Sequence, residues 1–257
     1  MSQPLPVLFL SHGSPMVALD PTGGGFKQWG RVLPRPEAIL AISAHWERTP
    51  PTLGIDHTGP LIYDFGSFPP ELYQVTYPAP PAPRLRMRVM ELLAPLGEVG
   101  QEPGRGWDHG VWTPLVHLFP QADIPLVQLS LPSRWGGEQL IELGRALAPL
   151  RHEGVLIAAS GVLVHNLRAI KWRGGEPEGW ASNFDQWVVD RLAAWDLPAL
   201  ASAHHLAPGF KESHPTDEHY LPLLVAVGAA DAGPHAVSYP ISGFQYGNLS
   251  NRSVQLG

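Results

Sequence analysis

The chain has 257 residues, a formal net charge of −6 at pH 7 and no cysteine. Without cysteine, disulfides, cysteine-held iron–sulfur clusters and thiolate zinc sites are excluded, so imidazole and carboxylate groups must hold any metal. The acidic balance and the lack of a Lys/Arg block argue against a nucleic-acid or anionic-membrane partner. The apolar runs are too short to cross a bilayer and no secretory signal is visible, so we expect a cytoplasmic protein.

Three short apolar runs that each lead to a histidine predict buried strands: residues 7–10 before His12, 38–44 before His45, and 155–160 before His165. In α/β proteins, ligands bind beyond the carboxyl ends of the parallel strands, at one edge of the sheet. We therefore expect these histidines to converge at one site.

The other predicted elements alternate between helices and strands. In chain order they are a helix over 26–33, a strand over 52–55, an ordered aromatic loop over 63–83, a helix over 85–96, a helix starting at Thr113-Pro114, a strand over 125–131, helices over 140–150 and 184–195, a helix starting at 216, and strands over 235–240 and 253–256. The alternation predicts an α/β fold in a single domain over residues 1–257, with helices on both faces of a sheet. The aromatic loop either forms a pocket wall or packs as an ordinary loop.

Five histidines stand near predicted element ends, beside small or turn residues: His12, His45, His109, His165 and His219. Several imidazoles plus a carboxylate suit a transition-metal site. Two histidines and one carboxylate leave positions open for dioxygen and substrate on Fe(II), whereas three histidines equally fit a hydrolytic zinc site. No HExxH or GxSxG motif is present, and spacing alone does not choose between the two metals.

The other seven histidines are assigned to structural or surface roles, His214 in support behind the site: His57, His117, His152, His204, His205, His214 and His235. Asp108 precedes His109 and either orients that imidazole or bonds nearby backbone in the turn, and we expect the turn role.

Five motifs occur in order along the chain: SHGSP at 11–15, SAHW at 43–46, WDHG at 107–110, SGVLVHNL at 160–167 and HPTDEHYLPL at 214–223. Together they resemble the class III extradiol ring-cleavage dioxygenases of the LigB-like superfamily, in the group of DOPA 4,5-dioxygenase-like proteins. The resemblance spans essentially the whole chain. It implies an α/β domain with a central mixed, mostly parallel sheet, flanked by helices on both faces.

The resemblance further implies a non-haem Fe(II), with Zn(II) as an alternative bound metal. It implies that the ring of a catechol substrate is cleaved next to the two hydroxyls, with both atoms of O₂ entering the product. His12 and His45 match metal ligands of the family, and His219 is the expected third ligand, with Glu218 as the alternate.

His165 matches an acid/base histidine that also contacts the metal in this branch, and His109 matches a second pocket histidine. We expect His165 to take a proton from the substrate, and His109 to stabilise the bound oxygen or protonate the product. His165 therefore stands both as a catalytic residue and as a candidate ligand.

Two other functions remain open from the residues alone. One is a zinc-dependent hydrolase on the same histidines, and the other is a non-catalytic metal- or aromatic-binding protein. The natural catechol, the position of ring cleavage and the oligomeric state also remain open.

Overall fold

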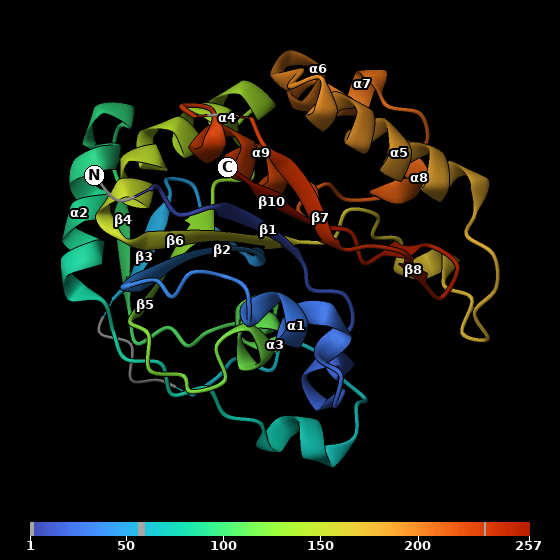
Figure 1. Cartoon of the computed structure of the whole chain (residues 1–257), viewed down its shortest axis with the longest axis horizontal. Helices are drawn as coiled ribbons and strands as arrows, with labels where there is room; N and C mark the ends of the chain where they lie inside the picture. Colours follow the sequence, from blue (N-terminus) through green and yellow to red (C-terminus); the bar gives the residue numbers. More distant parts are fainter. Residues whose placement is uncertain (1–2, 56–59, 234) are drawn as a thin grey trace.

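Within residues 3–55, 60–233 and 235–257, which the computed structural model describes, eight strands form one sheet in the order β4-β3-β5-β2-β6-β1-β10-β7 (Figure 1). The strands are β1 (Val7–Ser11), β2 (Ala38–Glu47), β3 (Thr52–Ile55), β4 (Gly100–Pro103), β5 (Leu126–Leu131), β6 (Val155–Gly161), β7 (Val237–Ile241) and β10 (Ser253–Leu256). A short pair, β8 (Phe244–Gln245) and β9 (Leu249–Ser250), lies apart from this sheet. His57 lies outside the described residues.

The centre of the sheet is parallel. β5, β2, β6 and β1 pair in parallel, whereas β3 joins β5 and β10 joins β1 in antiparallel fashion. The predicted mixed, mostly parallel sheet is therefore confirmed. Because the four central strands run the same way, their carboxyl ends open onto one edge of the sheet.

Side chains of the central strands alternate between two apolar layers. Val7 and Phe9 of β1 face one buried cluster, and Leu8 and Leu10 face the other. Helices α2 (Pro83–Leu93), α4 (Gly137–Leu147) and α9 (Leu221–Ala230) cover the first face, and α1 (Phe26–Gly30) and α3 (His109–Leu118) cover the second (Figure 1). Both faces of the parallel strands are thus buried, which explains why they read as continuous apolar runs. The other helices are α5 (Gly179–Ala193), α6 (Leu197–Ala201), α7 (Ala203–Leu206) and α8 (Phe210–Ser213).

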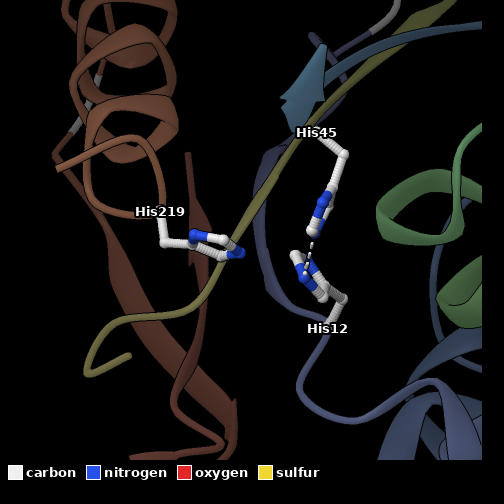
Figure 2. A group of neighbouring side chains, drawn as sticks. All are labelled: His12, His45 and His219. Carbon is white, nitrogen blue, oxygen red and sulfur yellow. Dashed lines mark hydrogen bonds between the residues drawn. The ribbon is translucent and has the colours of Figure 1, made fainter. Parts of the chain in front are cut away.

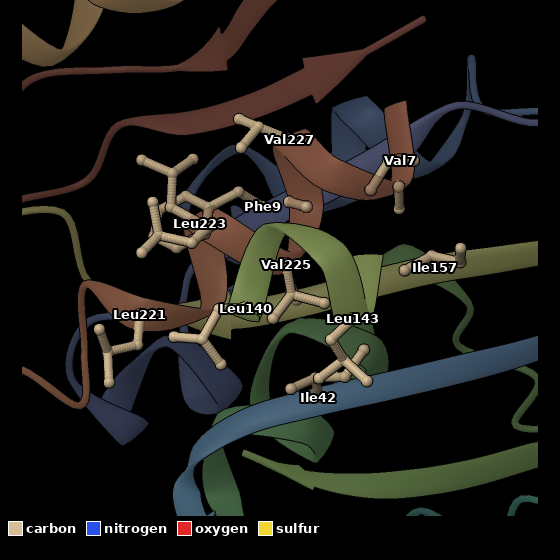
Figure 3. Packing of buried hydrophobic residues seen from close by; sticks show 14 of the residues in the cluster. Val7, Phe9, Ile42, Leu140, Leu143, Ile157, Leu221, Leu223, Val225 and Val227 are labelled. Carbon is tan, nitrogen blue, oxygen red and sulfur yellow. The ribbon is translucent and has the colours of Figure 1, made fainter. Parts of the chain in front are cut away.

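Helix α9 lies between the sheet and α4, and all ten of its residues are buried (Figure 3). Two glycines allow the close approach: a Cβ at Gly144 of α4 would overlap the Val225 carbonyl, and one at Gly228 of α9 would overlap the Ile141 carbonyl. A helix that is apolar all round is held by packing on every side. The segment just before α9 is therefore held firmly against the end of β6.

The starts of α3 and α9, which border the site, differ from the sequence prediction. Helix α3 begins at His109, not at Thr113, because the Asp108 carbonyl already accepts the N–H groups of Val111 and Trp112. The helix predicted from residue 216 begins only at Leu221, with Pro222 in its first turn. Before it, the His219 carbonyl accepts the Val162 N–H, which ties the chain to β6.

Among the described helices, none combines the length and the apolar character that crossing a lipid bilayer requires.

Candidate metal centre

Three histidines from distant parts of the chain point their rings toward one another (Figure 2). His12 follows β1, His45 lies in β2, and His219 lies two residues before α9. The Nε2 atoms of His12 and His45 are 3.0 Å apart. Each of the three rings offers a nitrogen atom, and these atoms lie within 4.8 Å of one another. The structure thus brings together three of the predicted ligands.

Carboxylates set the proton positions of two of these rings. Asp64 Oδ2 lies 3.2 Å from Nδ1 of His45, and Glu218 Oε1 lies 2.7 Å from Nδ1 of His219. An ionised carboxylate only accepts hydrogen bonds, so both Nδ1 atoms carry the proton and both Nε2 atoms present a lone pair. Neutral imidazole with a free Nε2 is a common metal ligand.

The Nε2 atom of His219 provides a test of whether a metal fits. It is buried and has no hydrogen-bond partner among the described residues. Leaving a buried acceptor unsatisfied is costly, and a bound cation would satisfy it. An imidazole donor set without cysteine suits a first-row transition metal. The residues present therefore fit a metal ion.

Asp64 is a site residue that sequence reasoning missed. Its Oδ1 accepts hydrogen bonds from Nδ1 of His109 at 2.8 Å and from the His109 backbone N–H at 3.1 Å, while Oδ2 faces His45. Burial raises the pKa of Asp64, but the hydrogen bonds from His109 and His45 outweigh it and leave the pKa lowered. One carboxylate therefore orients a candidate ligand and a candidate catalytic residue. The available signal was an acidic residue between Tyr63 and Phe65 in the predicted aromatic loop.

His165 lies beside His219 and outside the three-histidine group. The two rings stack with centroids 3.6 Å apart and planes 15° apart. The His165 backbone N–H donates to the Ser213 carbonyl, which holds this loop against the end of α8. Burial lowers the pKa of His165 to about 4, although Glu218 opposes the shift. His165 is therefore a neutral imidazole next to a candidate ligand.

His12, His109 and His219 are neutral for a common reason. Burial, together with the neighbouring imidazoles, lowers the pKa of His12 and of His219 well below the usual range. Burial also lowers the pKa of His109, against the opposing effect of Asp64. Rings that stay unprotonated keep lone pairs available for a metal or for a proton.

Asp108 has neither of the two roles considered from the sequence. Its buried carboxylate accepts hydrogen bonds from Ser43 Oγ at 2.7 Å and Gln128 Nε2 at 2.5 Å, and it pairs with Arg105 at 3.4 Å. It makes no side-chain cap to the backbone of α3, and it is Asp64 that orients His109. Asp108 instead ties the start of α3 to β2 and β5. Gly110 permits this approach, since a Cβ there would lie only 2.5 Å from Ser43 Oγ and 3.0 Å from His45 Cδ2.

Comparison with known proteins shows which family the chain belongs to and which activity it has. A family model described as the catalytic LigB subunit of aromatic ring-opening dioxygenase matches residues 6–249. The chain belongs to the LigB family of aromatic ring-opening dioxygenases. It is an extradiol ring-cleaving enzyme, as the motifs predicted. The family's chemistry selects the dioxygenase over the zinc hydrolase and over the non-catalytic binding protein.

Relatives of the dioxygenase match over most of its length. It is 43% identical to a protein of Escherichia coli K12 named 4,5-DOPA dioxygenase extradiol, over 98% of this chain and 95% of that protein. A protein of the same name from Beta vulgaris is 41% identical over 86% of this chain and 85% of its own length. A crystal structure of an uncharacterized Escherichia coli K12 protein matches with a TM-score of 0.83 and 39% identity, covering 98% of this chain and 100% of that chain.

Enzymes of this family depend on a metal, and the histidine group described above can hold one.

Beside the histidines, the dioxygenase has a cleft and an aromatic wall. A cavity of about 160 Å³ is lined by His12 together with Ser14, Tyr246 and Asn251. From the loop predicted to be aromatic, the Phe65 ring meets His109 edge to face at a centroid distance of 5.4 Å. Phe65 also packs against Phe68 and Tyr73. The loop therefore does reach the site, through both Asp64 and Phe65.

Proposed function

We propose that this dioxygenase opens the ring of a catechol with a DOPA-like side chain, using a non-haem Fe(II) held by His12, His45 and His219. The observation that carries the proposal is the convergence of three imidazole nitrogens from β1, β2 and the segment before α9. The names of the relatives at 41–43% identity support the substrate class. When bound, Fe(II) supplies a template for both catechol oxygens and for O₂, and a path for electrons between them.

Glu218, the alternate third ligand, acts in this proposal through His219. Its Oε1 accepts the Nδ1 proton of His219, so it directs Nε2 of that ring toward His12 and His45. Partners of this kind fix the tautomer and the orientation of a ligating histidine.

His165 serves as the general base. It lies beside the His219 ring, and burial keeps it neutral. A neutral imidazole at hydrogen-bond reach can take the proton of a catechol hydroxyl. His165 was also a candidate ligand, but its stacked position outside the three-histidine group favours the base role.

His109 acts together with Asp64. Because its Nδ1–H points at Asp64, the neutral ring has only a lone pair at Nε2. It can donate from Nε2 only after gaining a proton, and the Asp64 carboxylate stabilises that charged ring. We propose that this pair holds a proton close to the place where O₂ reacts, and later gives that proton to the product. The Phe65 edge against His109 limits water at this position.

Oxygen uptake tests the proposal. Metal-free protein is loaded anaerobically with Fe(II), in parallel with Zn(II), and L-DOPA, dopamine and simple catechol are added with oxygen. We expect oxygen consumption and a yellow product with Fe(II) and L-DOPA, and neither with Zn(II). His12→Ala and His45→Ala should lose the metal and the activity together, whereas His152→Ala, at an exposed histidine, should lose neither.

Protein shown to contain iron that consumes no oxygen with any of these catechols would overturn the substrate assignment. Full activity with Zn(II) would overturn the choice of Fe(II).

A further inference from the structure

Helix α3 carries a proline inside its second turn, and that proline leaves one carbonyl available. Pro114 has no N–H, so it cannot donate to the carbonyl of Gly110, four residues earlier. The side chain of Ser160 lies at this carbonyl, with Oγ 2.5 Å from the Gly110 oxygen. A carbonyl oxygen only accepts, so the Ser160 hydroxyl must be the donor.

The same Ser160 oxygen contacts His12. The distance between Oγ and Nδ1 of His12 is 3.0 Å, and both groups are buried. A serine hydroxyl has a single proton, and Gly110 already receives it. The hydrogen bond with His12 therefore requires Nδ1 of His12 to donate, which places the imidazole proton on Nδ1.

We propose that Ser160 is a positioning residue that fixes the tautomer of His12, and that Pro114 sets the direction of the hydrogen bond by freeing the Gly110 carbonyl. Nε2 of His12 then presents its lone pair toward His45 and His219. Nε2 of His45, 3.0 Å away, also carries a lone pair when Asp64 holds its Nδ1 proton, so in this arrangement the two atoms suit a cation, and a proton on Nε2 of His12 that is donated to His45 is the competing arrangement. The consequence for metal binding rests on the proposed role of His12 as a ligand, whereas the tautomer itself does not.

Ser160 does for His12 what Asp64 and Glu218 do for the other two rings, but without a charge. His45 and His219 each face a carboxylate oxygen through Nδ1. His12 faces a hydroxyl that is itself anchored to backbone. Ser160 lies in β6, next to β1 and β2, and the residue is 1% exposed. In this dry position a neutral anchor avoids burying a third anion.

Histidine ¹⁵N NMR of the metal-free protein tests the tautomer directly. Two-bond ¹H–¹⁵N correlations distinguish a proton on Nδ1 from a proton on Nε2. We expect His12 in the wild type to carry the proton on Nδ1. Ser160→Ala should lose this preference, and Ser160→Thr, which keeps a hydroxyl, should retain it. Ser130→Ala, at a buried serine of β5 that accepts the Thr52 N–H, serves as the matched control and should change nothing at His12.

Pro114→Ala tests the second part. The restored N–H competes with Ser160 for the Gly110 carbonyl, so the fraction of His12 protonated on Nδ1 should fall. With Fe(II) or Zn(II) titrated by calorimetry, Ser160→Ala should weaken binding about 10–100-fold, the range typical of such partners. Ser160→Thr should bind like the wild type.

A wild-type His12 with its proton on Nε2, or a Ser160→Ala tautomer identical to the wild type, would overturn the proposal. An unchanged tautomer in folded Pro114→Ala would remove the role of Pro114. Because the NMR measurement uses neither metal nor substrate, these outcomes are separate from a failure of the oxygen-uptake test.

Discussion

The candidate centre has two sides built from the same kinds of residue. The loop side consists of His45, Asp64 and His109, and the α9 side consists of His165, Glu218 and His219. On each side, two imidazoles and one carboxylate place their ligand atoms within 4.8 Å of one another. Each side contributes one proposed metal ligand and one proposed catalytic histidine.

The two sides differ in how the carboxylate is used. Asp64 accepts hydrogen bonds from both of its histidines, at 2.8 Å from His109 and 3.2 Å from His45. Of the two histidines on its side, Glu218 bonds His219 and not His165, which stacks on that ring; Glu218 Oε1 also accepts the Thr216 hydroxyl at 3.2 Å. Within the described part of the chain, the His165 ring has no hydrogen-bond partner. The loop side therefore holds both imidazoles in place, whereas the α9 side holds the proposed ligand and leaves the proposed catalytic ring, His165, able to exchange a proton.

The largest effect should come from removing that exchangeable ring. His165→Gln should lower kcat by roughly 10²–10⁴-fold, the usual contribution of a general base. The metal content should stay at the wild-type level, because His165 lies outside the three-histidine group. Steady-state kinetics with L-DOPA and elemental analysis of the same preparation measure both quantities. Loss of iron along with activity would make His165 a ligand, and His152→Gln is the control for a lost imidazole.

Changing each carboxylate to its amide should show that Asp64 affects both metal binding and turnover, whereas Glu218 affects metal binding alone. Asp64→Asn and Glu218→Gln should each weaken metal binding about 10–100-fold, as for other partners of ligating histidines. Asp64→Asn should also lower kcat at saturating metal, because an amide cannot accept from both His45 and His109. Glu218→Gln should recover nearly full kcat once metal is saturating. Equal recovery in the two variants would show that Asp64 does not act on catalysis through His109.

The prediction with the smallest effect on the reaction concerns His214, which lies behind the α9 side and should change the stability of the protein rather than its turnover. Burial lowers its pKa to about 4, and its Nε2 donates to the Leu163 carbonyl at 2.9 Å. The unfolded chain, with an ordinary histidine pKa near 6.5, binds this proton more readily than the folded chain. Stability of the metal-free protein should therefore fall as the pH drops from about 6.5 to about 4, with a share of roughly 3 kcal/mol from His214.

His214→Gln keeps an amide donor for Leu163 but cannot titrate. Urea unfolding across this pH range should show a shallower loss of stability in the variant than in the wild type. The exposed His152→Gln should follow the wild type. A variant slope equal to the wild-type slope would contradict the assignment of this loss to His214.

Much of this molecule could be predicted because the signals are local. The runs before His12 and His45 are short and apolar, as expected for strands buried on both faces, and the structure confirms them as β1 and β2. The order of the motifs identified the family, and the family model over residues 6–249 confirms it. The start of α3 was predicted wrongly because Thr113-Pro114 resembles a helix start, whereas the proline is tolerated one turn into the helix.

Sequence alone therefore determined most strands of the large sheet, the histidines that lie near their ends and the family of the chain, since each rests on neighbouring residues; it missed β4, β8 and β9. Only the tertiary structure decided what orients each ring. Asp64 is 45 residues from His109, and Ser160 is 148 residues from His12. These pairs depend on β6 lying between β1 and β2, and on the aromatic loop reaching the site. Hydrogen bonds between distant residues follow from strand order, and the alternation of helices and strands along the chain does not encode that order.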